Sequence, residues 1–249
     1  MSSAQDFAGL VAVVTGGASG IGAAVAAELQ ARGAAVAIVD RQLSTTPAGV
    51  LAVEADITDD ATVVAAVAKI AADLGGIDIL VNNAGIGAAG DIAANDDAEW
   101  HRVWDVNVVG IARMTRAALP WLKASDAASI VNTASVVAHV GVKDRALYAS
   151  TKGAVAALTL AMAADHLADG IRVNAVSPGT ADTPWVARLL EAAESPDAAA
   201  EALRRRQPMG RLVSADEVAW AVASLASPRA ASTTGTILSV DGGMRSVRV

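Results

Sequence analysis

The stretch Leu10–Arg32, LVAVVTGGASGIGAAVAAELQAR, decides the fold of this 249-residue chain. Its first five residues are apolar and rich in valine, which is typical of a strand buried in a parallel sheet. The glycine-rich turn Thr15–Gly22 follows, and Ala23–Arg32 has helical character. Glycines allow a tight turn and close approach of the backbone to a ligand, and the start of a helix attracts a phosphate. The spacing G-x-x-x-G-x-G also fits a plain turn, but the strand before it and the helix after it favour phosphate binding.

Strands and helices alternate along the rest of the chain. Short apolar runs predict strands at 35–39, 50–54, 77–81, 129–133, 171–177 and 235–240. Capping residues and apolar periodicity predict helices at 61–74, 96–122, 148–167, 185–206 and 215–226. We find no repeat and no linker. The pattern predicts a single α/β domain over residues 1–249, a doubly wound Rossmann-type fold with a seven-stranded parallel sheet and helices on both faces.

Composition excludes several classes of function. Hydrophobic residues make up 53% of the chain and charged residues 18%, which argues against disorder. The net charge of −7 argues against nucleic acid or an anionic membrane as a partner. The absence of cysteine excludes disulfides and thiolate chemistry. The first ten residues lack the features of a signal peptide, so a cytoplasmic location is expected. The histidines His101, His139 and His166 show no ligand spacing, so no metal is predicted.

An acid follows the second predicted strand. Asp40 lies about 20 residues past the glycines, where a dinucleotide's adenosine ribose is held. A carboxylate accepts hydrogen bonds from ribose hydroxyls and repels a 2′-phosphate, so Asp40 favours NAD over NADP. Two alternatives stay open: Asp40 is a loop acid that ends a strand, or the neighbouring Arg41 pairs with a 2′-phosphate.

The stretch Tyr148–Lys152 holds the only tyrosine of the chain and a lysine four residues later. On a helix these two side chains share one face. A nearby ammonium lowers the pKa of a phenol, so the pair is a candidate proton-transfer device. The same spacing is common on solvated helix faces and does not decide the question alone. Asn107, a polar residue within an apolar stripe, and Ser135, after the fifth strand, fit either a structural or a functional role.

Taken together, these motifs resemble the short-chain dehydrogenase/reductase family along essentially the whole chain. The matching positions, in order, are TGGASGIG (15–22), Asp40, Asp56-Ile57, NNAG (82–85), Asn107, Ser135, YASTK (148–152), Pro178-Gly179 and VDGG (240–243). The resemblance implies that Tyr148 exchanges a proton with the substrate oxygen, that Lys152 lowers the pKa of Tyr148 and binds the nicotinamide ribose, that Ser135 orients the substrate and that Asn107 supports a water. It implies cofactor contacts at Gly16, Ser19, Gly20, Ile21, Gly22, Asp40, Asp56, Ile57, Asn83, Ala84, Gly85, Tyr148, Lys152, Pro178, Gly179 and Thr183.

Three further segments are similar to one subgroup of that family. GTADTP (179–184), RRQPMGRL (205–212) and SPRAASTTG (227–235) resemble cytosolic type 2 3-hydroxybutyrate dehydrogenase and bacterial dehydrogenases of deoxy-sugar acids and L-fucose. In that subgroup, arginines around the pocket suit a carboxylate, and Arg145, Arg188 and Arg206 match here, beside Ser135 and Tyr148 as substrate contacts. A guanidinium fork binds a carboxylate bidentately, although solvated surface arginines fit the pattern equally well. Residues 182–206 are expected to cover the pocket.

The resemblance therefore implies an NAD-dependent oxidoreductase that interconverts a secondary alcohol and a ketone, with a small hydroxy acid or sugar-derived acid as substrate and a homotetramer as the assembly. Two alternatives remain. One is an NADPH-dependent ketone or 3-oxoacyl reductase of the same fold. The other is a dinucleotide-binding protein without turnover, against which the intact set of Asn107, Ser135, Tyr148 and Lys152 argues.

Overall fold

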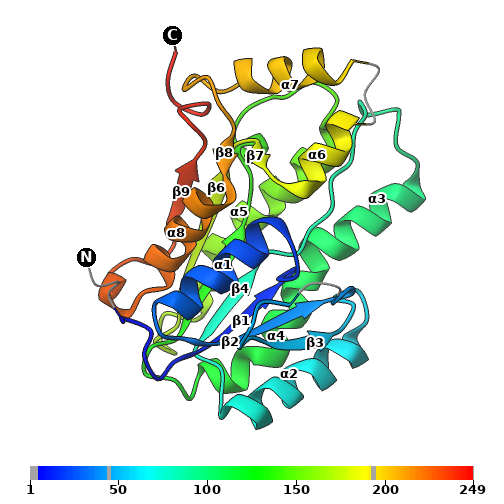
Figure 1. The fold of residues 1–249 in the computed structure, drawn as a ribbon. Coiled ribbons are helices and arrows are strands. Elements are labelled where there is room, and N and C mark those ends of the chain that lie inside the picture. Colours follow the sequence, from blue (N-terminus) through cyan, green and yellow to red (C-terminus); the bar gives the residue numbers. More distant parts are fainter. Residues whose placement is uncertain (1–4, 44–45, 192–194, 249) are drawn as a thin grey trace.

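The fold is built on one parallel sheet (Figure 1). A computed structural model describes residues 5–43, 46–191 and 195–248. In these residues seven strands pair in parallel, in the order β3 (Leu51–Glu54), β2 (Ala35–Asp40), β1 (Val11–Thr15), β4 (Ile79–Asn82), β5 (Ser129–Thr133), β6 (Arg172–Pro178) and β9 (Ile237–Val240). The order reverses between β1 and β4, which is where open α/β sheets bind ligands. The predicted fold class is confirmed.

Helices cover both faces of the sheet. The helices α1 (Gly20–Ala31) and α8 (Ala215–Ala226) pack on one face, with Val25, Leu29 and Val222 buried against strand residues such as Ile79. The other face carries α2 (Asp60–Leu74), α4 (Gly110–Leu122) and α5 (Ala146–Asp165). The two apolar layers fix the sheet between them and leave the carboxyl ends of its strands to form the site.

Local signals in the sequence explain where the helices begin and end. The Asp59 side chain accepts hydrogen bonds from the first turn of α2, and Gly75 ends that helix in the left-handed conformation. Ser214 and Glu217 form a capping box at the start of α8. These elements match their predicted ranges within two residues because short-range chemistry determines them.

The predicted helix over 96–122 is not one continuous α-helix. It consists of α3 (Asp97–Trp104), a π-helical turn η1 (Asp105–Val109) and α4. The π turn inserts extra backbone into the helix and contains the buried Asn107. Periodicity at 3.6 residues cannot show such an insertion, so the prediction of one helix was wrong here. Pro120 lies in the last turn of α4, which ends at Leu122 as expected.

The segment predicted to cover the pocket is divided. It contains α6 (Pro184–Glu191) and α7 (Pro196–Arg205), and residues 192–194 of the predicted helix lie outside the described residues. A small parallel pair, β7 (Ala181–Asp182) with β8 (Val213–Ser214), joins the two ends of this segment. The sequence does not predict that pair, because each strand has only two residues.

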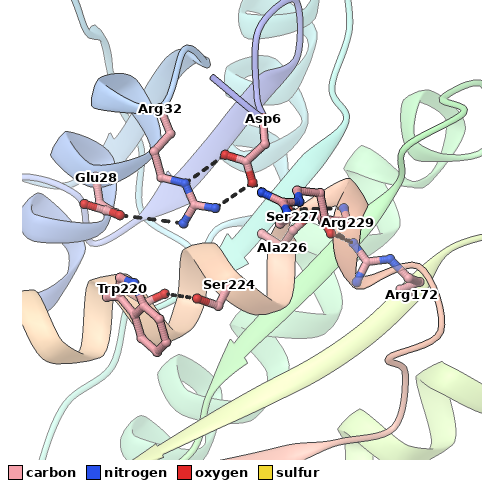
Figure 2. A network of polar contacts seen from close by, with 9 residues as sticks. All are labelled: Asp6, Glu28, Arg32, Arg172, Trp220, Ser224, Ala226, Ser227 and Arg229. Carbon is pink, nitrogen blue, oxygen red and sulfur yellow. Dashed lines mark hydrogen bonds and ion pairs between the residues drawn. The ribbon is translucent and has the colours of Figure 1, made fainter. Parts of the chain in front are cut away.

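A polar cluster joins β6, α8 and α1 at the amino end of the sheet (Figure 2). The Arg172 guanidinium, at the start of β6, donates to the carbonyl oxygens of Leu225, Ala226, Ser227 and Thr233. Arg32, at the C-cap of α1, donates two hydrogen bonds to Asp6, at 2.9 and 2.6 Å, and Asp6 also accepts from the Ser227 hydroxyl. The cluster ties the end of α8 to the rest of the fold, at the opposite end of the sheet from the site.

One described helix, α5, is long and apolar enough to cross a membrane by length and composition alone. In the fold it packs against β5, β6 and η1, and it carries the buried Lys152. Its apolar character is therefore that of a core helix.

Candidate active site

A cavity of about 620 Å³ opens at the carboxyl ends of the strands. It brings together residues that the sequence motifs single out in separate parts of the chain. The lining includes Gly16, Ser19, Gly20, Ile21, Asp40, Asp56, Ile57, Asn83, Ala84, Gly85, Ser135, Arg145, Tyr148, Lys152, Pro178, Gly179, Thr183, Arg188 and Arg206. Gly22 and Asn107, which the sequence also proposes, lie behind this surface.

The glycine-rich turn lies between β1 and α1. Gly16 and Gly20 adopt φ angles of +65° and +54°, which favour glycine. A Cβ at Gly22 would lie 2.1 Å from the Gly16 carbonyl oxygen, so Gly22 permits close packing of the helix on the turn. Ser19, at the N-cap of α1, makes no side-chain hydrogen bond to the first turn. The first N–H groups of α1 are therefore not capped by this side chain, and the turn fits the phosphates of a dinucleotide.

Asp40 ends β2 at the rim of the cavity. Its carboxylate accepts from the backbone N–H groups of Ala18 and Gln42, at 3.1 and 3.3 Å, which fixes it beside the glycine turn. Arg41 lies 3.6 Å from the Asp56 carboxylate. Burial raises the pKa of Asp56, but hydrogen bonds from Thr58 and the Arg41 charge outweigh it, so this pKa lies below its ordinary value. Arg41 thus pairs with Asp56 in this structure. The Asp40 carboxylate stays at the rim of the cavity, where a ribose would lie.

Tyr148 and Ser135 meet at the mouth of the cavity. Ser135 follows β5, and its hydroxyl lies near enough to the phenol of Tyr148, in the first turn of α5, to affect the pKa of that phenol. Burial raises the pKa of Tyr148 above its ordinary value, while the Ser135 hydroxyl and the charge of Arg145 oppose this rise. A phenol and a hydroxyl near each other provide two groups that could hold one substrate oxygen.

Lys152 lies one helical turn beyond Tyr148, as predicted, but its contacts differ from the expectation. It is 4% exposed, its ammonium donates to the Thr133 carbonyl at 2.8 Å, and it lies 5.8 Å from the centre of the Tyr148 ring. Burial lowers the pKa of Lys152 to about 8. The prediction that this ammonium lowers the pKa of Tyr148 does not hold, because burial of the phenol has the larger effect and raises its pKa. No sequence motif predicts the Thr133 carbonyl as a partner of Lys152.

Asn107 supports the loop that follows β4. Its amide oxygen accepts from the Ile86 N–H at 2.8 Å, and its amide nitrogen donates to the Ile86 carbonyl and the Thr151 hydroxyl. Asn107 therefore joins the loop Asn83–Gly87 to α5, one residue before Lys152. These contacts fit the structural role that the sequence left open, and sequence reasoning missed both Ile86 and Thr151.

Positive charge collects in the substrate half of the cavity. Arg145 precedes α5, where Asp144 has a φ of +58° and the backbone of Arg145 forms a bridge with Gly90. Arg188 and Arg206 come from the covering segment. Over the described part of the chain, no carboxylate lies within ion-pair distance of these three arginines, whereas Arg102, also in the lining, pairs with Glu99 at 3.7 Å.

The fold and the site define a dinucleotide-binding α/β oxidoreductase. The family profile described as enoyl-(acyl carrier protein) reductase matches residues 16–245. The chain is 43% identical to cis-4-hydroxycyclohexanecarboxylate dehydrogenase of Sinomonas cyclohexanicum, over 98% of this chain and 99% of that protein. It is 38% identical to 2-(S)-hydroxypropyl-CoM dehydrogenase 3 of Xanthobacter autotrophicus, over 95% and 97%. The structure of ligand-free aldohexose dehydrogenase of Thermoplasma acidophilum matches with a TM-score of 0.92 and 36% identity, over 98% and 97%. The protein belongs to the short-chain dehydrogenase/reductase family.

Proposed function

We propose that the protein is an NAD-dependent dehydrogenase that oxidises the secondary alcohol of a small hydroxy acid or sugar-derived acid. One observation carries the proposal: Ser135 and Tyr148 line a single cavity with Asp40 and with three arginines that lack a carboxylate partner in the described chain. By their names, the relatives described above act on a hydroxycyclohexanecarboxylate, on a hydroxypropyl compound and on an aldohexose, and the first of these is a hydroxy acid.

Four residues of the chain have separate roles in the proposed reaction. The glycine-rich turn and Asp40 would hold NAD, which would supply the acceptor for the hydride of the carbinol carbon. Ser135 holds the substrate oxygen by a hydrogen bond, and Tyr148 removes the hydroxyl proton, so that the alcohol becomes a ketone. Lys152 supplies a positive charge at the base of the cavity, and a positive charge close to Tyr148 favours its phenolate and opposes the effect of burial. Asn107 hydrogen-bonds both Ile86 and Thr151 and so holds the loop after β4 against α5.

Asp40 supports NAD as the cofactor. Its carboxylate is fixed at the end of β2 by two backbone N–H groups and could accept from both ribose hydroxyls, whereas a 2′-phosphate would meet its charge. Arg41 is engaged with Asp56 and would have to leave that carboxylate to bind a 2′-phosphate. The NADPH-dependent reductase is therefore the weaker alternative.

The arginines support an acid as the substrate. The cavity lining contains five arginines and Lys152 against two acids, Asp40 and Asp56, in a chain with a net charge of −7. Two of these arginines, Arg41 and Arg102, already have carboxylate partners, which leaves Arg145, Arg188 and Arg206. A concentration of positive charge in an acidic protein attracts an anionic substrate to the cavity.

A substrate screen tests the proposal. Formation of NADH would be measured with hydroxy acids, deoxy-sugar acids and matched neutral alcohols, each with NAD and with NADP. We expect the acids to exceed their neutral analogues in kcat/KM and NAD to exceed NADP. Higher kcat/KM with NADPH on ketones or acyl thioesters would favour the alternative reductase. Absence of turnover on the whole panel, with NAD binding intact, would favour a protein that binds a dinucleotide without turnover.

We also propose a cytoplasmic homotetramer. Trp220 on α8 is 63% exposed and lies beside Leu238 of β9, the last strand in the order of the sheet, in a shallow apolar depression. An edge strand with an apolar neighbour is a surface that a second copy could cover. Sedimentation analysis of the protein and of Trp220→Glu tests this assembly.

A further inference from the structure

The loop after β4 and helix α6 meet across the mouth of the cavity through a close contact between Gly87 and Trp185. A Cβ at Gly87 would lie 2.6 Å from Cζ2 and 3.0 Å from Cη2 of the Trp185 indole. Gly87 does not have a positive φ, so its backbone conformation does not require glycine. The reason for glycine at this position is therefore the space that the indole occupies.

The indole is only partly covered by this contact. Trp185 is 46% exposed and lines the cavity, together with its neighbours Pro184 and Val186 and with Leu203 of α7. Its benzene edge rests on Gly87, and much of its remaining surface is free to meet a ligand. A large apolar surface beside a cavity is a candidate for direct contact with the hydrocarbon part of a substrate.

Arg188 lies three residues after Trp185, so the two side chains project from the same side of α6. Both line the cavity, and no described carboxylate pairs with Arg188. One turn of helix thus presents an aromatic wall and a guanidinium to the same space. This combination suits a ligand that has a carboxylate at one end and an apolar ring beside it.

We propose that Trp185, held in place by Gly87, is a specificity-determining residue that selects hydroxy acids with a hydrocarbon ring over short acyclic ones. The inference rests on the proposed function, because it assigns the apolar part of that substrate. In this arrangement the ring packs on the indole while the carboxylate meets Arg188 on the same side of α6, whereas a short chain leaves the indole without contact. Discrimination by such a pocket is of the order of tenfold to a few hundredfold.

Substitutions at the two positions test the proposal. For Trp185→Ala, we expect kcat/KM for cis-4-hydroxycyclohexanecarboxylate to fall at least about tenfold, mainly through KM, and kcat/KM for 3-hydroxybutyrate to change less than about threefold. Trp185→Phe should retain most of the preference. Trp121→Ala serves as the matched control, since Trp121 is 41% exposed on α4 and lies outside the cavity lining. An unchanged ratio between the two substrates in Trp185→Ala would overturn the proposal.

Gly87→Ala tests the contact itself. The added Cβ should displace the indole and raise KM for the ring acid in the otherwise unchanged protein. In the Trp185→Ala background, the same change should have little further effect. An equal effect of Gly87→Ala in both backgrounds would show that the loop, and not the indole, requires glycine.

A second readout separates this inference from the proposed function. Shifts in the melting temperature of the two single variants and the double variant measure the Gly87–Trp185 coupling without any substrate. If the unchanged protein oxidised no hydroxy acid, the proposed function and the assigned ligand would both fail, while additive shifts would overturn the contact alone.

Discussion

The Lys152 ammonium donates a hydrogen bond to the Thr133 carbonyl oxygen at 2.8 Å, at the end of β5. A cation is thus held by the sheet at the base of the cavity, 5.8 Å from the centre of the Tyr148 ring. Because burial costs the ammonium its hydration, the pKa of Lys152 is lowered to about 8. The buried ammonium therefore lowers the stability of the folded protein while it is charged.

This lowered pKa predicts that stability rises with pH between about 8 and 10. Below pH 8 the folded and unfolded chains both hold the Lys152 proton, and the folded chain bears the cost of the buried charge. Above pH 8 the folded chain releases the proton while the unfolded chain keeps it up to its ordinary value of 10.5, so the folded state gains in relative stability. Between pH 7 and 9.5 we expect a gain of about 2 kcal/mol from this group.

Denaturant unfolding of the protein and of Lys152→Met at both pH values measures the gain. The methionine variant lacks the titrating group and provides the control, so the difference between the two proteins isolates Lys152. The upper limit of pH 9.5 stays below the ordinary pKa of 10.0 at which Tyr148 of the unfolded chain loses its proton, because the raised pKa of Tyr148 in the folded chain would act in the opposite direction above that value. A difference that does not depend on pH would show that the lysine keeps an ordinary pKa.

Tyr148→Phe should bind NAD with unchanged affinity and lose turnover by about a thousandfold or more, since general acid–base groups contribute factors of this size. The phenylalanine keeps the ring of Tyr148, so its packing in the hydrophobic cluster with Leu147 and Val103 is retained. Steady-state kinetics and a fluorescence titration with NADH separate the two effects. Retention of most of the activity would remove Tyr148 from the reaction.

Asp40→Ser should shift preference from NAD towards NADP. The serine removes the charge that faces a 2′-phosphate and leaves a hydroxyl beside the Ala18 N–H. We expect kcat/KM with NADP to rise about tenfold or more and kcat/KM with NAD to fall, because one unfavourable charge contact is worth on the order of 1–2 kcal/mol here. The comparison needs both cofactors at saturating substrate. A protein that already prefers NADP would contradict the role assigned to Asp40.

Much of the fold was predictable because local patterns determine it. The strand Ser129–Thr133 was placed to the residue, and capping residues placed the ends of α2 and α8 within two residues. Short buried strands of valine and isoleucine leave little ambiguity in an alternating chain.

The site was less predictable where it depends on contacts between distant segments. The π turn that holds Asn107, the Thr133 carbonyl that holds Lys152 and the indole that requires Gly87 all involve partners that no motif contains. Spacing placed Lys152 beside Tyr148 on α5, but burial decided their pKa values. Desolvation depends on how deeply the whole fold buries each group. A sequence pattern therefore cannot predict whether the pKa values of two neighbouring groups are raised or lowered.

Arg188→Leu should raise KM for an acidic substrate by about tenfold to a hundredfold with little change for a neutral alcohol, as expected when a charge-assisted pair is lost. Arg204→Leu is the matched control. It removes an equal charge from the same covering segment, but Arg204 pairs with Glu201 and lies outside the cavity lining. Equal effects of the two variants would point to long-range attraction instead of direct contact with a carboxylate.

Arg172→Met should destabilise the fold without changing the chemistry of the site. The Arg172 guanidinium donates to the Ser227 carbonyl at 3.1 Å, which also accepts from the Ala230 N–H (Figure 2). It also donates to Leu225 at 2.7 Å and Ala226 at 2.9 Å, two carbonyls at the end of α8 that accept from no other donor in the described residues. Its charge also complements the negative end of that helix. Methionine fills similar volume but leaves these carbonyls unpaired, at a cost of about 3 kcal/mol. For a chain of this length the melting temperature should fall by roughly 10 °C.

Arg229→Met, at an exposed position beside the same cluster, is the control. KM and kcat of Arg172→Met at a permissive temperature should match those of the unchanged protein. An unaltered melting temperature would show that water replaces the guanidinium at the end of α8 without loss.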